Sequence, residues 1–167
     1  MTPVVVRDAV AADWRDIWAF TAPILAAGET YAVDRDITAD RARRWWMVEP
    51  PGRTFVAVAD SRVLGSAKLV RNQDGGGAHV ANASFLVDPA AGGQGIGRLL
   101  GEYVLAAARA AGFRAMQFNA VVETNTAAVR LWTGLGFAVL TTVPEAFDHP
   151  RHGLVGLHIM HRRLREP

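Results

Sequence analysis

A glycine-rich turn at residues 92–97 has the composition and the place in the chain of an anion-binding site. Its six residues are Gly92, Gly93, Gln94, Gly95, Ile96 and Gly97. An apolar, β-prone run at 79–87 precedes the turn, and apolar residues at helical spacing follow it. Glycines let the backbone come close to a ligand, and the start of a helix carries a partial positive charge. The turn is therefore predicted to bind a phosphate or pyrophosphate.

Two familiar phosphate-binding motifs do not fit this turn. A P-loop ends in Gly-Lys-Ser/Thr, but here Gly97 is followed by Arg98 and Leu99. The dinucleotide fingerprint Gly-x-Gly-x-x-Gly fails in both frames, because its last position falls on Arg98 or Leu100. A plain strand-to-helix turn that is rich in glycine stays open as an alternative.

A second segment, residues 125–137, has a pattern of its own. Its characteristic positions are Asn125, Ala128, Leu131, Trp132, Gly136 and Phe137. This spacing predicts a short helix with one apolar face. Thr124 or Asn125 can cap the start of that helix, and Gly136 can end it.

Together, the two segments resemble motifs of the GNAT acetyltransferases, in the same order and at a similar distance. The turn matches Arg/Gln-x-x-Gly-x-Gly/Ala, except that Gly92 stands at the first position. The later segment resembles Asn-x-x-Ala-x-x-Leu-Tyr-x-x-x-Gly-Phe, with Trp132 in place of the tyrosine. Residues 4–13 resemble the opening strand and first helix of that family. The resemblance implies one α/β GNAT domain over residues 1–167, with a mixed, mostly antiparallel sheet flanked by helices.

The composition is that of an ordinary globular domain. Half of the 167 residues are hydrophobic, 20% are charged, and the formal net charge is +2. The lack of cysteine excludes disulfides and thiolate metal sites, and the spacing of the five histidines suits no metal. No basic–aromatic run predicts a nucleic-acid partner. Without a long apolar run or a signal-peptide pattern, we expect a cytoplasmic protein with no membrane contact.

The hydrophobic periods predict the order of the elements. Helices are expected over 11–26, 38–46, 96–111 and 125–135. Strands are expected at 4–6, 55–59, 63–70, 79–87, 115–121, 137–143 and 154–163.

The GNAT resemblance implies acetyl-CoA as co-substrate, without a metal. In that family the glycine turn holds the pyrophosphate, the preceding strand pairs with the pantetheine arm, and the asparagine at the start of the later helix contacts that arm. Backbone N–H groups near Leu86 and Val87 would polarise the thioester carbonyl. The residues expected to bind the cofactor are Phe85, Leu86, Val87, Gly92, Gly93, Gln94, Gly95, Ile96, Gly97, Arg98, Asn125 and Trp132.

The groups that move protons are less clear in the sequence. Glu29, in the loop 28–37, is the leading candidate for the general base, and an exposed loop glutamate is the alternative. His149 and His152 are expected in the loop between the last two strands, at another wall of the acceptor site. Trp132 occupies the place of the family's tyrosine acid. Since a thiol of pKa about 8.5 is a tolerable leaving group, the chain is predicted to work without that acid.

Polar residues on otherwise apolar strands indicate an acceptor site. A neutral amide can donate to a carboxylate and accept from an amine, which suits Asn82 and Asn119 to an amino-acid-like acceptor. Their strands resemble those of GNAT enzymes that acetylate proline analogues, and the segment 29–46 resembles phosphinothricin-type acetyltransferases. The alternative is that both asparagines satisfy local backbone groups. The residues expected to bind substrate are Glu29, Tyr31, Asn82, Asn119 and His152.

Three functions follow as hypotheses. The favoured one is an acetyl-CoA-dependent N-acetyltransferase for a small amino-acid-like amine such as a proline analogue. It would act as a homodimer by direct attack on the thioester, with Asn119, Glu29 and Val87 as catalytic residues. The second is an acetyltransferase for a protein N-terminus or lysine, which needs an open groove. The third is a non-catalytic acyl-CoA sensor, suggested by the departures at Gly92 and Trp132.

Overall fold

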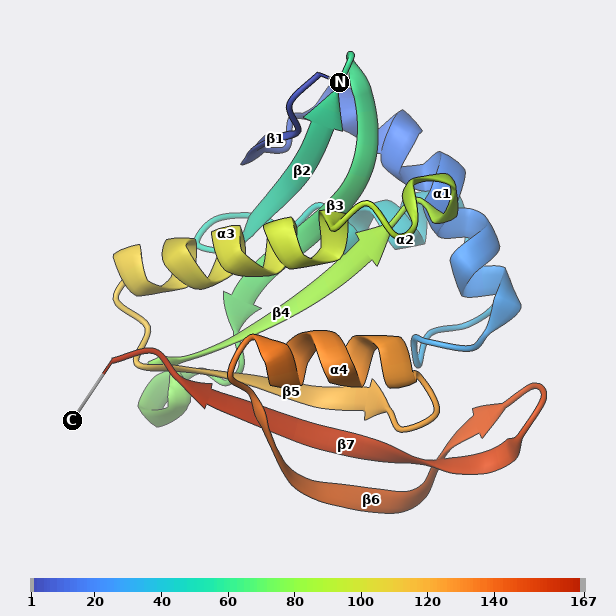
Figure 1. Ribbon diagram of the computed structural model, residues 1–167, viewed down its shortest axis with the longest axis vertical. Coiled ribbons are helices and arrows are strands. Elements are labelled where there is room, and N and C mark those ends of the chain that lie inside the picture. The colour runs from blue at the N-terminus through green and yellow to red at the C-terminus, as the bar shows by residue number, and fades with distance from the viewer. Residues whose placement is uncertain (1, 166–167) are drawn as a thin grey trace.

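The computed structural model describes residues 2–165, which form a seven-stranded sheet in the order β1-β2-β3-β4-β5-β7-β6 (Figure 1). The β4–β5 pair is parallel, and the other neighbouring strands are antiparallel. The strands are β1 (Val5–Asp8), β2 (Arg53–Ala59), β3 (Arg62–Arg71), β4 (Val80–Val87), β5 (Ala115–Val122), β6 (Ala138–His149) and β7 (Gly153–Arg163).

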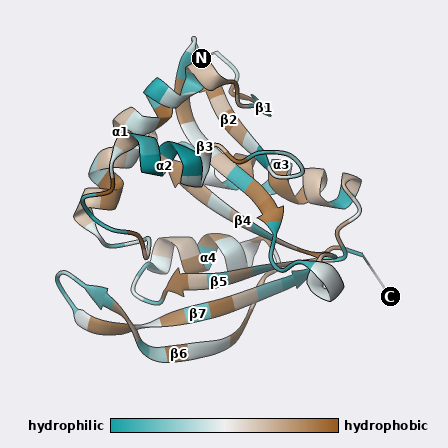
Figure 2. Cartoon of the chain, turned by 180° about the vertical axis from the view of Figure 1, so that it is seen from behind, coloured by the Kyte–Doolittle hydropathy of each residue, from teal (hydrophilic) through white to brown (hydrophobic). Residues whose placement is uncertain are grey.

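Helices cover both faces of this sheet. They are α1 (Trp14–Ala27), α2 (Ala39–Trp46), α3 (Ile96–Ala110) and α4 (Thr126–Gly134), with short 3-10 turns at Ala11–Asp13, Gly75–Gly77 and Pro89–Ala91. Helices α3 and α4 lie over the face seen in Figure 1, and α1 and α2 over the face seen in Figure 2. The predicted fold, a mixed and mostly antiparallel sheet flanked by helices, is therefore confirmed. None of the helices within residues 2–165 combines the length and the apolarity needed to cross a bilayer.

Each face of the sheet has its own core, because side chains alternate along a strand. On β2, Phe55 and Ala57 face the core beneath α3, whereas Val56 faces the core beneath α1 and α2. Trp46, at the end of α2, is fully buried in the second core and donates to the Ser66 hydroxyl (2.8 Å). The two cores fix the helices on opposite sides of β4, the strand on which the site is built.

The parallel pair β4–β5 separates soon after it begins. Its registered pairs are Val80 with Ala115 and Ala81 with Met116. Beyond them the two strands diverge, as Figure 1 shows, while β4 keeps its pairing with β3 up to Val87. The second half of β4 therefore has one edge without a strand partner.

The final hairpin is longer than the sequence predicted. Strand β6 continues to His149 instead of ending near residue 143, after an irregularity between Val143 and Phe147. Pro144 and the left-handed Glu145 (φ 50°) interrupt the alternation of side chains along the strand there. The hydrophobic period therefore does not predict the part of β6 that follows them. The expectation that His149 lies in a loop was wrong, since it is a strand residue and only 5% exposed.

Candidate active site

The glycine turn leads into α3 with its backbone N–H groups free of side-chain caps. Gly93 and Gly95 have φ values of +74° and +77°, which favour glycine, and open space surrounds both. Gly95 is the N-cap of α3 and offers no capping side chain, and the first helical bond runs from Leu99 N–H to Gly95 O (3.0 Å). The N–H groups of the first turn are therefore available to an anion, and their binding of a pyrophosphate stays a prediction.

The last glycine of the turn has a packing role. A Cβ on Gly97 would lie 3.2 Å from the Leu131 side chain, and one on Gly101 only 2.6 Å from that of Leu135. Both contacts are with α4 or the residue that ends it. The two glycines therefore let α3 and α4 approach closely, which sets α4 beside the unpaired edge of β4.

The open edge of β4 presents main-chain groups of alternate residues. The β3–β4 ladder continues to Asp88, whose N–H donates to Leu64 O (2.9 Å). Because successive residues of a strand direct their main-chain groups to opposite sides, Phe85 and Val87 direct theirs into the gap. Of the two amides expected to polarise a carbonyl, that of Val87 faces the gap and that of Leu86 faces β3.

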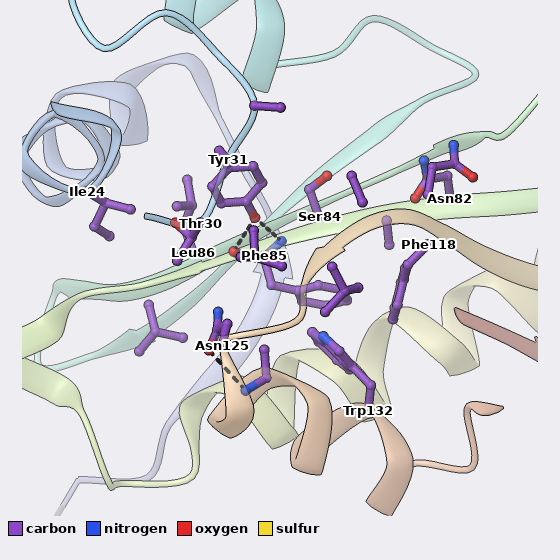
Figure 3. Close-up of a pocket in the computed structure, with 18 residues that line it drawn as sticks. Ile24, Thr30, Tyr31, Asn82, Ser84, Phe85, Leu86, Phe118, Asn125 and Trp132 are labelled. Atoms are coloured by element: carbon purple, nitrogen blue, oxygen red, sulfur yellow. Dashed lines mark hydrogen bonds between the residues drawn. The ribbon is translucent and has the colours of Figure 1, made fainter. Parts of the chain in front are cut away.

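A cavity of about 400 Å³ occupies the gap between β4 and β5 (Figure 3). Within residues 2–165, the side chains that line it include no carboxylate, imidazole or ammonium group. Its polar side chains are Thr30, Tyr31, Asn82, Ser84, Asn119 and Asn125. The structure thus brings together three of the expected substrate residues, Tyr31, Asn82 and Asn119, with the strand segment 85–87.

Aromatic packing holds the gap open on the α4 side. The Trp132 ring lies 4.5 Å from that of Phe85 on β4 and 4.9 Å from that of Phe118 on β5, between centroids. Phe118 in turn stacks on Phe137 at 4.3 Å. Trp132 is 7% exposed and lines the cavity. The residue that replaces the family's tyrosine therefore acts as a wedge between the two strands.

Asn125 combines a structural contact with a place in the cavity wall. Its Oδ1 accepts from Ala128 N–H (3.2 Å) and so caps α4, as the sequence predicted. The residue also lines the cavity, opposite Tyr31 in Figure 3. The cap fixes the orientation of the amide, which leaves its Nδ2 group for a ligand.

Asn119 lies in a chain of amides at an irregularity of β5, where the register shifts between Phe118 and Val121. Its Nδ2 donates to Asn72 Oδ1 (2.7 Å), and its Oδ1 accepts from Gln117 Nε2 (3.0 Å). The alternative in which Asn119 satisfies backbone groups is therefore not what the structure shows. Asn72 and Gln117 hold the amide at the rim of the cavity.

Tyr31 reaches the open edge of β4 from the loop between α1 and α2. Its hydroxyl donates to Phe85 O (2.5 Å) and accepts from Phe85 N–H (3.0 Å). The ring packs edge-on against Trp45 and Trp46, at 5.5 and 6.4 Å between centroids. Burial raises the pKa of the Tyr31 phenol, so the hydroxyl is neutral at physiological pH.

The other two residues expected to bind substrate, Glu29 and His152, lie outside the cavity lining, as do the expected cofactor residues 92–98. The Glu29 carboxylate forms an ion pair with Arg151 Nη2 (2.9 Å), which ties the α1–α2 loop to the β6–β7 turn. His152 lies in that turn, with its ring 4.5 Å from that of the buried His149. Neither Glu29 nor His152 lines the cavity. Their roles as base and substrate contact stay predictions.

Sequence reasoning missed two hydroxyls of the cavity, those of Thr30 and Ser84. Ser84 follows Asn82 at the spacing that puts two strand residues on one face, so the pattern could have identified it. Thr30 Oγ1 is buried without a hydrogen-bond partner among the described residues. No local signal in the sequence separates Thr30 from an ordinary loop residue.

Known proteins share both this fold and these motifs. The model of the acetyltransferase (GNAT) family matches residues 12–137. The curated relative N-acetyltransferase aca1 of Schizosaccharomyces pombe is 29% identical over 134 residues, 71% of this chain and 64% of that protein. The chain therefore spans less than two thirds of that relative's length.

Solved structures give the same result. A GCN5-related N-acetyltransferase from Kribbella flavida is 57% identical, with a TM-score of 0.93 over 96% of this chain and 97% of that one. A phosphinothricin acetyltransferase from Sinorhizobium meliloti, solved with AcCoA, is 24% identical and shares the fold, with a TM-score of 0.85 over 98% and 89% of the two chains. The family match, which covers well over half of the sequence, shows that this chain belongs to the acetyltransferase (GNAT) family.

Proposed function

We propose that this chain transfers the acetyl group of acetyl-CoA to the amine of a small amino-acid-like acceptor. The observation that carries the proposal is the cavity between β4 and β5. It is about 400 Å³ in volume, and its polar lining consists of amides and hydroxyls without a formal charge. Such a lining can hydrogen-bond both the carboxylate and the free amine of a small amino acid, whereas a protein substrate needs a longer groove.

The chain's own groups fit acetyl-CoA along the glycine turn and β4. The uncapped N–H groups at the start of α3 suit a pyrophosphate, even though Gly92 supplies no positive charge there. Val87 offers main-chain groups at the open edge of β4, and Asn125 offers an amide from the opposite wall. When bound, acetyl-CoA would supply an activated acetyl thioester at this edge.

The neutral cavity constrains how the acceptor amine loses its proton. Burial of an ammonium group without a charged partner is unfavourable, and no carboxylate lines the cavity to stabilise one. The acceptor is therefore expected to react as the free amine, with its proton released to water. Turnover should then rise with pH until the amine is fully deprotonated.

Two structural neighbours with a named substrate or a bound cofactor share the fold of this chain. One structural neighbour is a phosphinothricin acetyltransferase from Sinorhizobium meliloti, and another, yncA of Salmonella typhimurium, was solved with acetyl-CoA. Both are 24% identical to this chain, so they show that the fold is shared and do not identify the substrate. The lining of the cavity is the independent argument.

The test is the release of coenzyme A from acetyl-CoA across a panel of amines. The panel contains azetidine-2-carboxylate, cis-4-hydroxyproline, phosphinothricin, methionine sulfoximine, a polyamine and a lysine peptide. Turnover on the amino acids, and its loss on the matching carboxamides, would support the proposal. Turnover on the peptide alone would contradict it, and binding of acetyl-CoA without any turnover would favour the sensor hypothesis.

The expected homodimer stays a prediction. Strand β6 is an edge of the sheet and exposes Val139, Leu140 and Val143. Sedimentation equilibrium measures the assembly directly, and a monomer at micromolar concentration would contradict the prediction.

A further inference from the structure

The Tyr31 hydroxyl takes the place of a strand partner at the open edge of β4. It accepts from Phe85 N–H and donates to Phe85 O, as the dashed lines of Figure 3 show. A neighbouring strand would offer the same pair of groups, one acceptor and one donor. Tyr31 lies 54 positions from Phe85 in the sequence, so tertiary packing brings the two residues together.

The position that Tyr31 occupies lies on the path of the acetyl donor. The glycine turn follows the carboxyl end of β4, so an arm that runs from the turn along this edge passes Val87 before Phe85. Both residues direct their main-chain groups into the gap. A ligand that pairs with both must replace the Tyr31 hydroxyl at Phe85.

We propose that Tyr31 competes with acetyl-CoA for the main-chain groups of Phe85 and is displaced from them when acetyl-CoA binds. The inference rests on the proposed use of acetyl-CoA. Tyr31 is then a positioning residue. Its hydroxyl satisfies the main-chain hydrogen bonds of Phe85 in the free enzyme and is replaced there by acetyl-CoA. The exchange costs little, because one set of neutral hydrogen bonds replaces another.

The surroundings of Tyr31 allow this exchange. Tyr31 belongs to the loop between α1 and α2. The exposed ion pair between Glu29 of this loop and Arg151 links the loop to the β6–β7 turn. The adjacent Thr30 hydroxyl is buried at the same cavity and has no hydrogen-bond partner in the part of the chain that the structure describes, so the loop has a polar group that a new arrangement can satisfy. The neutral phenol leaves without the separation of a buried ion pair.

The chain has two tyrosines, which makes the proposal directly measurable. Labelling with 3-fluorotyrosine gives one fluorine resonance for Tyr31 and one for Tyr103. Tyr103 lies on α3, with its ring 5.4 Å from that of Phe55 on the far side of the sheet from Tyr31. We expect acetyl-CoA to shift the Tyr31 resonance and to leave that of Tyr103 in place. An unmoved Tyr31 resonance at saturating acetyl-CoA overturns the proposal.

The second measurement is the affinity of Tyr31→Phe for acetyl-CoA, with Tyr103→Phe as the matched control. Removal of the competing hydroxyl is expected to tighten binding about three- to tenfold by calorimetry, the factor that one neutral hydrogen bond gives. The control should bind like the parent. Unchanged or weaker binding by a folded Tyr31→Phe overturns the proposal, as does a collapse of turnover at saturating acetyl-CoA, which would make Tyr31 a group that acts in the reaction itself.

The two proposals fail in different ways. A parent enzyme that does not bind acetyl-CoA removes the proposed function, and this inference with it. A parent enzyme that binds acetyl-CoA and turns over an amine, while the Tyr31 resonance stays fixed, removes this inference alone.

Discussion

The two ends of the candidate site are built in different ways. At the end proposed to bind acetyl-CoA, called the donor end, the chain offers main-chain groups of the glycine turn at the start of α3 and of the open edge of β4. At the other end, proposed to bind the acceptor and called the acceptor end, it offers side chains from separate segments, such as Asn82 on β4 and Asn119 on β5. A backbone site needs a short stretch of glycines and a strand, whereas a side-chain site needs the whole fold to assemble it.

This difference predicts how each end responds to substitution. A site built from main-chain groups loses affinity only when a substitution places a bulky or charged side chain in it. Shortening a side chain elsewhere leaves such a site intact. A side-chain site loses affinity in steps, one contact at a time. Substitutions at both ends test this contrast.

The largest effect is expected from Gly95→Asp at the donor end. A carboxylate about 4 Å from a phosphate costs about 4 kcal/mol near a protein surface, which weakens acetyl-CoA binding by about 1000-fold. Calorimetry measures the loss. Gly95→Asn has the same shape without the charge and should keep most of the affinity.

Gly75→Asp is the control for backbone strain that is introduced away from the glycine turn. Gly75 has a φ of +56° and open space around it, like Gly95, but lies in the 3-10 turn Gly75–Gly77. Equal losses from Gly95→Asp and Gly95→Asn would mean that strain, and not repulsion of an anion, causes the effect. Undiminished binding by Gly95→Asp would remove the turn from the site.

The donor end could be predicted from sequence because its determinants are local. The glycine turn, the Asn125 cap and the wedge position of Trp132 each lie within one short motif, and each is found where the motif puts it. The mixed sheet followed from the same motifs and from the hydrophobic periods. The end of β6 was predicted too early, because a local break such as Pro144 gives no sign that pairing with β7 continues beyond it.

The acceptor end could be predicted only in part because its contacts join distant segments. The polar positions on β4 and β5 identified Asn82 and Asn119. The contact of Tyr31 with Phe85, and that of Glu29 with Arg151, depend on how loops fold over the sheet. Glu29 was assigned a chemical role from its loop, yet its carboxylate faces Arg151 and not the cavity.

A second large effect concerns Lys68, which is buried behind the acceptor end, opposite Ser84 in the β3–β4 register. Its ammonium donates to Trp45 O (2.7 Å) and lies 4.2 Å from the centre of the Trp45 ring. Burial lowers the pKa of Lys68 to about 8. The folded protein therefore binds fewer protons than the unfolded chain between about pH 8 and the ordinary lysine value.

The free energy of unfolding should accordingly rise with pH across that window, by up to about 3 kcal/mol. Urea unfolding at pH 7.5 and pH 10 measures the change, and the difference from Lys68→Met isolates the contribution of this one group. Well below pH 8 the lysine is protonated in both states, so no further pH dependence arises from it. Parallel pH profiles for the two proteins would show that Lys68 keeps its ordinary pKa.

A smaller effect is expected from Asn119→Ala at the acceptor end. Loss of one amide from the cavity should raise the KM for the acceptor about tenfold, the factor for a hydrogen bond to a charged group. The affinity for acetyl-CoA should not change, because the donor end is built from main chain. Asn72→Ala, which frees the Asn119 amide without removing it, should give a weaker loss of the same kind.

An unchanged KM for the acceptor in Asn119→Ala would place Asn119 outside the acceptor contacts. A parallel loss of acetyl-CoA affinity would instead mean that the irregularity of β5 supports both ends of the cavity. Either result would weaken the division between the two ends.

The smallest effect is expected at the ion pair between Glu29 and Arg151, whose side chains are 35% and 70% exposed. Exposed pairs contribute at most about 1 kcal/mol, so Glu29→Gln and Arg151→Gln should each lower kcat/KM about two- to fivefold. If the pair acts only by tying the α1–α2 loop to the β6–β7 turn, the double variant should lose no more than either single variant. Steady-state kinetics of the three variants measure this coupling.

The same cycle decides whether Glu29 is the general base. A base contributes about 100-fold or more to the rate, and its loss would lower kcat in Glu29→Gln while Arg151→Gln kept most of its activity. The ion pair favours the opposite result, since the Glu29 carboxylate lies against Arg151 and not in the cavity. Equal and small losses would leave the acceptor end without a charged catalytic group, in keeping with its lining of amides and hydroxyls.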